Sequence, residues 1–452
     1  MSKVRRISNF QHTFTFSSQT EQFDIFYQRF LQSDLGKIYL AVPWDELVEA
    51  FGLKEPKKGP ASLFSPKGKL ALMFLKHYGS CSDKRLVQQL NGNLEWQFFC
   101  DLYLGKERLK NYKVVSEVRC ELAKKLDIDQ IQQVFYKHWS PHIEDKHSIT
   151  TDATCYESHL RYPTNVKLLW ECVDWLQGKM KTICKEKGEP LPRTKYLKWK
   201  KRYISYSKMR RKTKKKRKAI TRSLLLLLDK INGELDRLEK DGMGHFSANY
   251  HKRRAAAKKV FAQQHAYFHK EEKPKNRIVS IDRPYIRPIV RGKEVKPVEF
   301  GAKVNKFQID GIGFVEHLSF EAFHEGNRLI DTIFKAQRLT HVKTKLVGAD
   351  AIYATNKNRK FITSHDIQTD FKRKGKAGKH ENQRKKLAGA ITRERASRLE
   401  GSFGKDKEHY HLKRIKARTK ATEKLWIFFG IHTGNALEIG RRMMAKRLQE
   451  AA

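Results

Sequence analysis

The stretch that decides the fold reads KTKLVGADAIYATNKNRKF and covers residues 343–361. Its apolar run at 346–349 has the length of a short buried strand, and it ends at the carboxylate of Asp350. An acid at the end of a buried strand is costly unless a positive group meets it, although such an acid can also simply cap a helix. The residues from Asn356 onward have helical spacing, so the stretch predicts a strand, an acid and a helix.

The composition shows a large excess of positive charge. The 452 residues contain 94 Lys and Arg but only 49 Asp and Glu, which gives a net charge of +45 at pH 7. A field of this size favours a polyanion, first of all nucleic acid, with an anionic membrane surface or the ribosome as alternatives. Because 39% of the residues are hydrophobic, the chain can form real cores, and its length allows two or three domains.

The cysteines and apolar runs indicate the compartment. The six cysteines are scattered without paired spacing, so neither a zinc site nor a disulfide framework is expected. The first residues lack the apolar segment of a secretory signal. The longest apolar run, at 224–228, is far shorter than the roughly 20 residues of a membrane-spanning helix. We therefore expect a cytoplasmic protein without a membrane partner.

The first part of the chain, residues 1–135, is expected to form a small all-helical domain. Apolar residues recur at helical spacing, and turns at Gly79 and at 91–92 separate the segments. Short helices with basic flanks are consistent with binding DNA ends, but they could equally only pack or dimerise.

The second part, residues 142–440, has the element order of an α/β domain interrupted by helices. A strand rich in β-branched residues covers 148–154, and strands resume near 298 with a hairpin turn at 310–311. Between them, residues 160–275 have strong helical periodicity. We expect this segment to be a helical insertion within the α/β domain.

The insertion contains a run without any acid, from Arg193 to Arg222. Aromatic residues are interleaved with its cations, which suits phosphate contact and base stacking. A solvated basic helix face is the simpler alternative, and the composition of 210–218 also matches a nuclear address. The candidate DNA-binding residues here are Trp199, Arg210, Arg211, Lys214, Lys215 and Lys216; Tyr196, Tyr203 and Tyr206 are the other interleaved aromatics.

Three carboxylates stand at unusual positions: Asp152 on the first strand, Asp350 at the end of the apolar strand, and Glu400 on a late helix. The predicted core face of that helix consists of Thr392, Ala396, Leu399 and Phe403. Three converging acids suit Mg²⁺, which prefers oxygen ligands and keeps water positions for a phosphate substrate. Glu400 alone, however, could be an ordinary surface residue.

The chain resembles the DDE transposases of bacterial insertion sequences, in the superfamily named after insertion sequences four and five. The similar segments are PWDELVEAFG with FSPKGKLALMFLKHYGSCSDKRLVQQLNGNLEWQFFCDL, SITTDATCYES with YPTNVKLL, RPIVRGKEVKPVEFGAKVN, VGADAIYATNKNRKFI with Tyr353 and Asn356, SRLEGSFGKDKEHYHLKRIKART, and GIHTGNAL with Asn435. The match covers most of the chain from about residue 40, and the order of the motifs makes the set specific. Asn165 departs from it, because this family often has Asp after PT.

This resemblance implies an α/β, RNase H-like mixed-sheet core in which Asp152, Asp350 and Glu400 bind two Mg²⁺ ions, with Mn²⁺ as an alternative. Asp152 would bridge the two ions. Lys407 and Arg398 on the glutamate helix would contact DNA, since Lys407 is seven residues from Glu400 and shares its helix face. Glu394 is the rival third acid, but it lacks a lysine at that spacing.

The function implied by the resemblance is transposition. The protein would bind the terminal inverted repeats of its element, hydrolyse phosphodiester bonds and transfer the ends to target DNA. It would act as a homodimer on double-stranded DNA, in association with the bacterial nucleoid. Two other classes stay open at this point: a non-catalytic basic nucleic-acid-binding protein, and a stand-alone metal-dependent nuclease.

Overall fold

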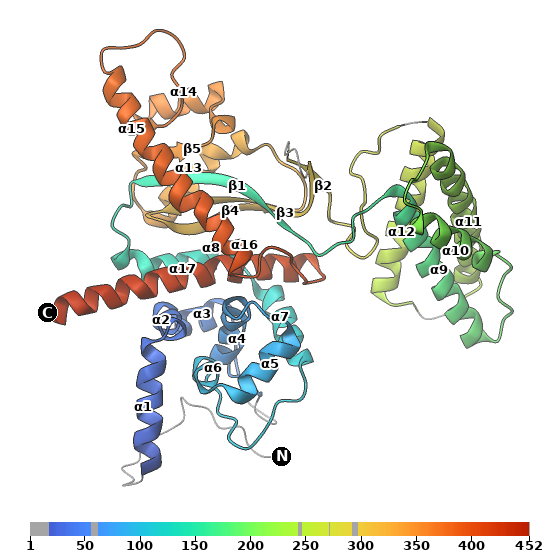
Figure 1. Ribbon diagram of the computed structural model, residues 1–452, viewed down its shortest axis with the longest axis horizontal. Helices are drawn as coiled ribbons and strands as arrows, with labels where there is room; N and C mark the ends of the chain where they lie inside the picture. Colours follow the sequence, from blue (N-terminus) through green and yellow to red (C-terminus); the bar gives the residue numbers. More distant parts are fainter. Residues whose placement is uncertain (1–17, 56–61, 243–245, 271, 292–296, 452) are drawn as a thin grey trace. The chain divides into compact units, whose positions relative to one another are not determined.

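The computed structural model describes residues 18–55, 62–242, 246–270, 272–291 and 297–451. The first 17 residues of the predicted N-terminal domain, and residues 292–296 within the motif 287–305, lie outside the described residues. The chain divides into two compact units, made of residues 1–158, 302–319 and 323–452 and of residues 159–301 and 320–322 (Figure 1).

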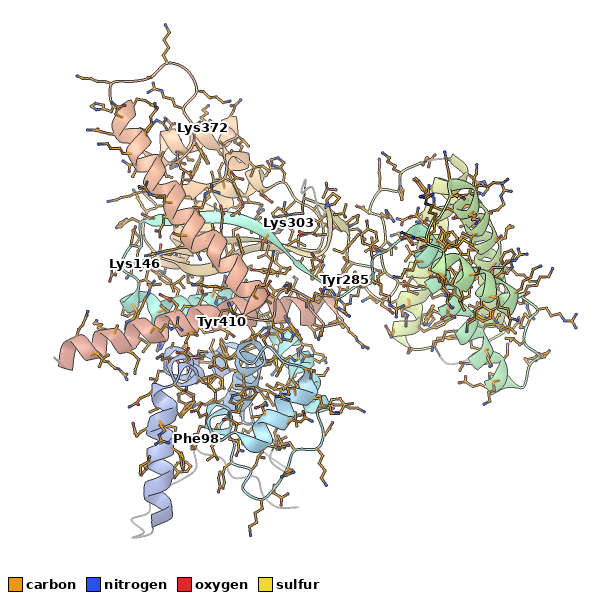
Figure 2. All side chains as sticks on the ribbon, in the orientation of Figure 1. Phe98, Lys146, Tyr285, Lys303, Lys372 and Tyr410 are labelled. Atoms are coloured by element: carbon orange, nitrogen blue, oxygen red, sulfur yellow. The ribbon has the colours of Figure 1, made fainter. Side chains whose placement is uncertain are left out.

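The first unit begins with the helical region expected from the sequence. Side-chain caps start several of its helices: Ser33, Ser65 and Asp127 each accept a hydrogen bond from a backbone N–H of the first turn. Phe98 packs against aromatic rings of the first helix (Figure 2). The helices are α1 (Ser18–Gln32), α2 (Asp34–Ala41), α3 (Trp44–Ala50), α4 (Pro66–Tyr78), α5 (Asp83–Gly92), α6 (Leu94–Phe99), α7 (Lys113–Lys125) and α8 (Ile128–Trp139), followed by the 3₁₀ turn η2 (Ser140–His142).

A mixed six-stranded sheet follows. Its strands are β1 (Ser148–Glu157), β2 (Pro288–Val290), β3 (Val298–Ile309), β4 (Ile312–Ser319), β5 (Leu346–Ala349) and β6 (Gln368–Thr369). The order is β2-β3-β1-β5-β6, and β4 pairs with β3. Strand β5 is parallel to both β1 and β6. Asp310 and Gly311 have φ angles of 49° and 80°, which a tight hairpin turn requires, so the predicted hairpin is confirmed.

Helices complete this RNase H-like fold. They are the 3₁₀ turn η3 (Glu325–Arg328), α13 (Leu329–Thr340), the 3₁₀ turn η4 (Ala351–Tyr353), α14 (Asn356–Ser364), α15 (Glu381–Glu394), the π-helical turn η5 (Arg395–Glu400), α16 (Gly401–Glu408) and α17 (Lys420–Ala451). Helix α17 contacts α2, α4 and α7 as well as β4 (Figure 1). Asn435 on α17 holds β4 through both the N–H and the C=O of Gly313. The N-terminal helices and the sheet therefore share one continuous hydrophobic core.

The second unit has its own hydrophobic core between helices. The apolar residues that recur at helical spacing within 168–180 and within 224–238 are buried in it, as the helical periodicity of the segment predicts. Its helices are α9 (Asn165–Lys187), α10 (Tyr196–Lys208), α11 (Lys214–Lys240) and α12 (Ala248–Lys270). The predicted insertion, 160–275, lies within this unit, which continues to Gly301 and includes β2.

The predicted core face of the glutamate helix is partly wrong. Leu399 and Phe403 are buried, but Thr392 and Ala396 are exposed, and Ile391 is buried instead. The cause is η5, because a π turn pairs residue i with i+5 and so takes in one residue more than an α turn. The extra residue changes which side chains before the turn face the core.

Candidate active site

The register of two parallel strands brings Asp152 and Asp350 together. Thr151 of β1 is the partner of Ala349 of β5, so the acids that follow these two residues are neighbours, about one strand spacing of 4.8 Å apart. Asp152 Oδ1 accepts the N–H of Ala153 at 2.8 Å, and Asp350 Oδ1 accepts the N–H of Ala351 at 2.6 Å. Both carboxylates are thus fixed at the point where β5 ends.

Arg395 connects Glu400 to these strands. Its Nη1 lies 4.0 Å from Asp350 Oδ1 and 3.8 Å from Glu400 Oε1. Arg395 and Glu400 are the first and last residues of η5, and a π turn places residues five apart on the same helix face. The irregular turn therefore directs Glu400 towards Asp350, which matches the frequent occurrence of π turns at functional sites.

Asp152 experiences an excess of negative charge. Burial is the main cause that raises its pKa to about 6, and the nearby Glu325 and Asp350 carboxylates raise the pKa further, whereas the Ala153 N–H and the Arg395 guanidinium lower it. Arg395 alone does not compensate for these carboxylates. A bound cation would favour the ionised form of Asp152.

The donor set fits a hard divalent cation. Asp152, Asp350 and Glu400 offer carboxylate oxygens, and the side chains of Asp350 and Glu400 are 57% and 53% exposed. The Arg395 guanidinium lies among the acids at distances longer than hydrogen bonds, and its Nε has no hydrogen-bond partner. The carboxylates therefore keep ligand capacity, although no three His, Cys, Asp or Glu side chains within the described ranges are already arranged to hold a metal ion.

Glu394 and Arg398 take part in different contacts. Arg398 Nε lies 3.1 Å from Glu394 Oε1, and Arg398 Nη1 donates to Asp310 Oδ1 at 3.0 Å. The second contact ties Arg398 to the β3–β4 hairpin turn. The rival acid is thus paired with Arg398, while Glu400 is beside Arg395 and Asp350; a DNA-binding role for Arg398 stays a prediction.

Lys407 lies on the same face of β1 as Asp152. Its Nζ donates to Thr154 Oγ1 at 3.0 Å and lies 5.9 Å from the centre of the Tyr156 ring. Residues two apart on a strand point to the same side, so Thr154 and Asp152 share one face. This placement is consistent with a phosphate contact near the acids.

Asp406, which has no distinctive sequence context, anchors α16 to the sheet. Its Oδ2 accepts the hydroxyl of Tyr156 at 2.6 Å and the Nζ of Lys306 at 2.7 Å. Burial and the Asp406 carboxylate hold the pKa of Tyr156 well above its usual range. Since Lys306 is on β3 and Tyr156 on β1, one carboxylate fixes the glutamate helix to two strands.

Two further acids near the cluster were not predicted from the sequence. Asp370 follows β6; its side chain is 4% exposed, accepts the N–H of Ala349 at 3.2 Å and lies 3.7 Å from Arg395 Nε. Burial raises the pKa of Asp370. Glu325 pairs with Lys303 of β3 at 2.7 Å (Lys303 is labelled in Figure 2). The signal for Asp370 was present, because IQTD, like LVGAD, is a strand that ends on an acid.

In the second unit, the predicted DNA-binding cations are exposed. Arg210 and Arg211 lie in the connection between α10 and α11, and Lys214–Lys216 form the start of α11. Trp199 is half-buried, with the guanidinium of Arg202 4.9 Å from its ring centre.

The interleaved tyrosines of the second unit belong to its core. Tyr196 and Tyr203 stack on Trp170 with centroid distances of 5.6 and 4.7 Å, and Tyr206 is buried. Base stacking is therefore wrong for Tyr206, whereas for the half-buried Tyr196 and Tyr203 it stays a prediction.

Comparison with known families adds two matches. The family model described as "Transposase DDE domain" matches residues 347–430, and the one described as "Transposase domain (DUF772)" matches residues 26–121. The chain is an insertion-sequence DDE transposase. The first match contains Asp350 and Glu400 of the transposase, whereas Asp152 lies outside both matches. No curated protein and no solved structure matches the chain.

The matches agree with the charge of the transposase, since transposases act on DNA. Within the described ranges, the helices of the transposase are all too short or too polar to span a membrane.

Proposed function

We propose that the transposase binds the terminal inverted repeats of its element, hydrolyses phosphodiester bonds there and joins the exposed 3′ ends to target DNA. Asp152, Asp350 and Glu400 are the proposed ligands of Mg²⁺, or of Mn²⁺ in its place. The observation that carries this proposal is twofold: the register of β1 and β5 makes Asp152 and Asp350 neighbours, and η5 leaves Arg395 beside both Asp350 and Glu400.

Each proposed role follows from position. When bound, two divalent ions activate an attacking oxygen and stabilise a leaving oxygen on the phosphate. Asp152, whose pKa is raised by the nearby carboxylates of Glu325 and Asp350, is the proposed bridging ligand. Lys407 is proposed to bind a DNA phosphate beside the cut, and Asp406 keeps Lys407 and Glu400 in register with β1.

DNA binding is proposed to involve both units. The exposed cations of the second unit would contact phosphates without reading sequence. The N-terminal helices would contribute to recognition of the repeat, and two copies of the chain would hold two ends.

A cleavage assay separates the proposed function from its two alternatives. Linear DNA that carries the element's ends, and scrambled DNA of equal length, are incubated with the full-length protein in Mg²⁺ or in EDTA. Cleavage at the ends alone, and only in Mg²⁺, is the expected result. A stand-alone nuclease would cut both DNAs at similar rates, and a non-catalytic binding protein would bind DNA but cut neither.

A further inference from the structure

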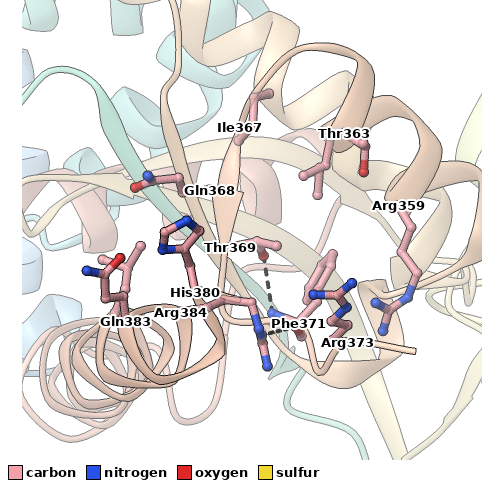
Figure 3. Close-up of a pocket in the computed structure, with 12 residues that line it drawn as sticks. Arg359, Thr363, Ile367, Gln368, Thr369, Phe371, Arg373, His380, Gln383 and Arg384 are labelled. Carbon is pink, nitrogen blue, oxygen red and sulfur yellow. Dashed lines mark hydrogen bonds between the residues drawn. The ribbon is translucent and has the colours of Figure 1, made fainter. Parts of the chain in front are cut away.

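A cavity of about 600 Å³ lies beside β6, between α14 and the first turns of α15 (Figure 3). Apolar side chains, including Ile362, Ile367 and Phe371, form part of its lining, and the guanidinium groups of Arg359, Arg373 and Arg384 are in its wall. A mostly apolar cavity with a few polar groups is the usual form of a small-ligand site.

Two of the arginines build the wall. Arg359 Nη1 donates to the carbonyl of Lys372 at 2.8 Å, and Arg384 Nη1 donates to the carbonyl of Phe371 at 3.1 Å. These bonds fix the backbone of residues 371–372. Arg373 differs, because it makes no hydrogen bond or salt bridge at contact distance within the part of the chain that the structure describes. The nearby Glu381 carboxylate, which Arg373 also influences, is already paired with Arg384, so the Arg373 guanidinium can bind a ligand phosphate.

The cavity and the acid cluster lie on opposite sides of one extended segment. Thr369 and Phe371 line the cavity, whereas the Asp370 side chain between them points to Arg395, 3.7 Å away. Neighbouring side chains of an extended chain point to opposite sides. A DNA strand that passes around this edge of the sheet could therefore contact both places.

The cavity lies in a strongly cationic part of the chain. Residues 372–386 contain eight Lys and Arg and one acid, so an anionic ligand is favoured. The lining also contains the amides of Gln368 and Gln383 (Figure 3), which can donate to and accept from the polar edge of a base. An apolar floor, amides and a guanidinium that makes no hydrogen bond in the described part of the chain together suit a nucleotide.

We propose that this cavity binds one unpaired nucleotide of the DNA substrate, with its base against the apolar floor and its phosphate at Arg373. In a paired duplex, the faces and edges of a base are already covered by its neighbours. Only a nucleotide outside the duplex can enter. The proposal rests on the proposed function, since it assigns a second contact on the same DNA.

The test compares three DNAs in EDTA, so that no cleavage occurs: a blunt duplex carrying the element's end, the same duplex with one unpaired terminal nucleotide, and the same duplex with an abasic unpaired residue. The full-length wild type is expected to bind the second DNA about 10-fold more tightly than the first. The abasic residue should remove most of this gain. A 2-aminopurine as the unpaired base should change in fluorescence when it enters the cavity.

Two variants and a control locate the effect. Thr363→Trp, at an exposed position in the lining, should fill the cavity and abolish the gain without weakening binding of the blunt duplex. Arg373→Gln should reduce the gain. Lys376→Gln, in the same cationic segment but outside the lining, should weaken binding of all three DNAs alike.

Equal affinity of the wild type for all three DNAs would overturn the cavity assignment while leaving the proposed function intact. A gain that survives in Thr363→Trp would overturn it in the same way. Absence of binding to any DNA would instead contradict the proposed function itself.

Discussion

The buried pair of Lys306 and Asp406 allows a stability prediction with a magnitude. The Lys306 side chain is 1% exposed and that of Asp406 6% exposed. Changing Asp406 to Ala leaves the ammonium of Lys306 buried without its carboxylate, which costs about 3–5 kcal/mol. The change also removes the acceptor of the Tyr156 hydroxyl, at about 1 kcal/mol. We expect the first unit of Asp406→Ala to be less stable than the wild type by about 4–6 kcal/mol.

Urea unfolding followed by tryptophan fluorescence measures this destabilisation, with Trp139 as a fully buried reporter in the same unit. The double variant Lys306→Met, Asp406→Leu should recover most of the stability, because replacing a buried ion pair by apolar residues of similar volume is often neutral or stabilising. Glu408→Ala is the matched control. It breaks an exposed pair with Lys413 beside the same helix and should cost less than about 1 kcal/mol.

Two results would refute the reasoning. The first is a destabilisation below about 1 kcal/mol in Asp406→Ala, which would mean that water reaches Lys306. The second is a double variant whose destabilisation equals the sum of those of Lys306→Met and Asp406→Leu measured singly, because the two charges would then not be coupled.

Three other predictions concern the acids, the basic insertion and the N-terminal helices. Asp152→Asn should stabilise the protein in EDTA at pH 7 by up to about 3 kcal/mol. The reason is that the pKa of Asp152 is about 6 in the folded chain, compared with the ordinary value of 3.8. Above pH 6 the folded wild type therefore carries an unfavourable charge that the variant lacks. Thermal unfolding should show this gain disappearing below about pH 4, and lower stability of the variant at pH 7 would contradict it. The salt dependence of DNA binding should become shallower when five cations of the second unit, Arg210, Arg211, Lys214, Lys215 and Lys216, are changed to Gln. The slope of log K against log salt should fall by about 0.9 for each phosphate that the variant no longer binds. An unchanged slope in a salt titration would mean that these cations are only solvated. A fragment of residues 1–135 should be much less cooperative in thermal unfolding than the intact chain, because α17 completes the core of its helices; a sharp transition at the temperature of the intact chain would argue against this.

The parts of the fold that depend on local pattern were predictable from sequence. The strand that ends on Asp350 is visible in its apolar run, and the hairpin at Asp310 in its turn residues. The position of Glu400 came with the resemblance. The π turn could not be predicted in this way, because helical periodicity assumes 3.6 residues per turn. The predicted core face before Glu400 is therefore partly wrong.

Long-range pairs left no local signal. Lys306 and Asp406 are 100 residues apart, and neither stands out in its own segment. The same applies to Tyr203, because its stacking partner Trp170 lies on another helix. Asp370 is different, because it follows a strand that the sequence indicates, although β6 is only two residues long.

The proposed metal-binding cluster of Asp152, Asp350 and Glu400 is tested most directly by Mg²⁺-dependent cleavage with variants that still bind DNA. Asp350→Ala and Glu400→Gln should bind end-bearing DNA as the wild type does but should not cut it. Glu394→Gln, which alters only the pair with Arg398, should cut at close to the wild-type rate. Cleavage by Asp350→Ala at the wild-type rate, or abolished cleavage in Glu394→Gln with retention in Glu400→Gln, would contradict the account.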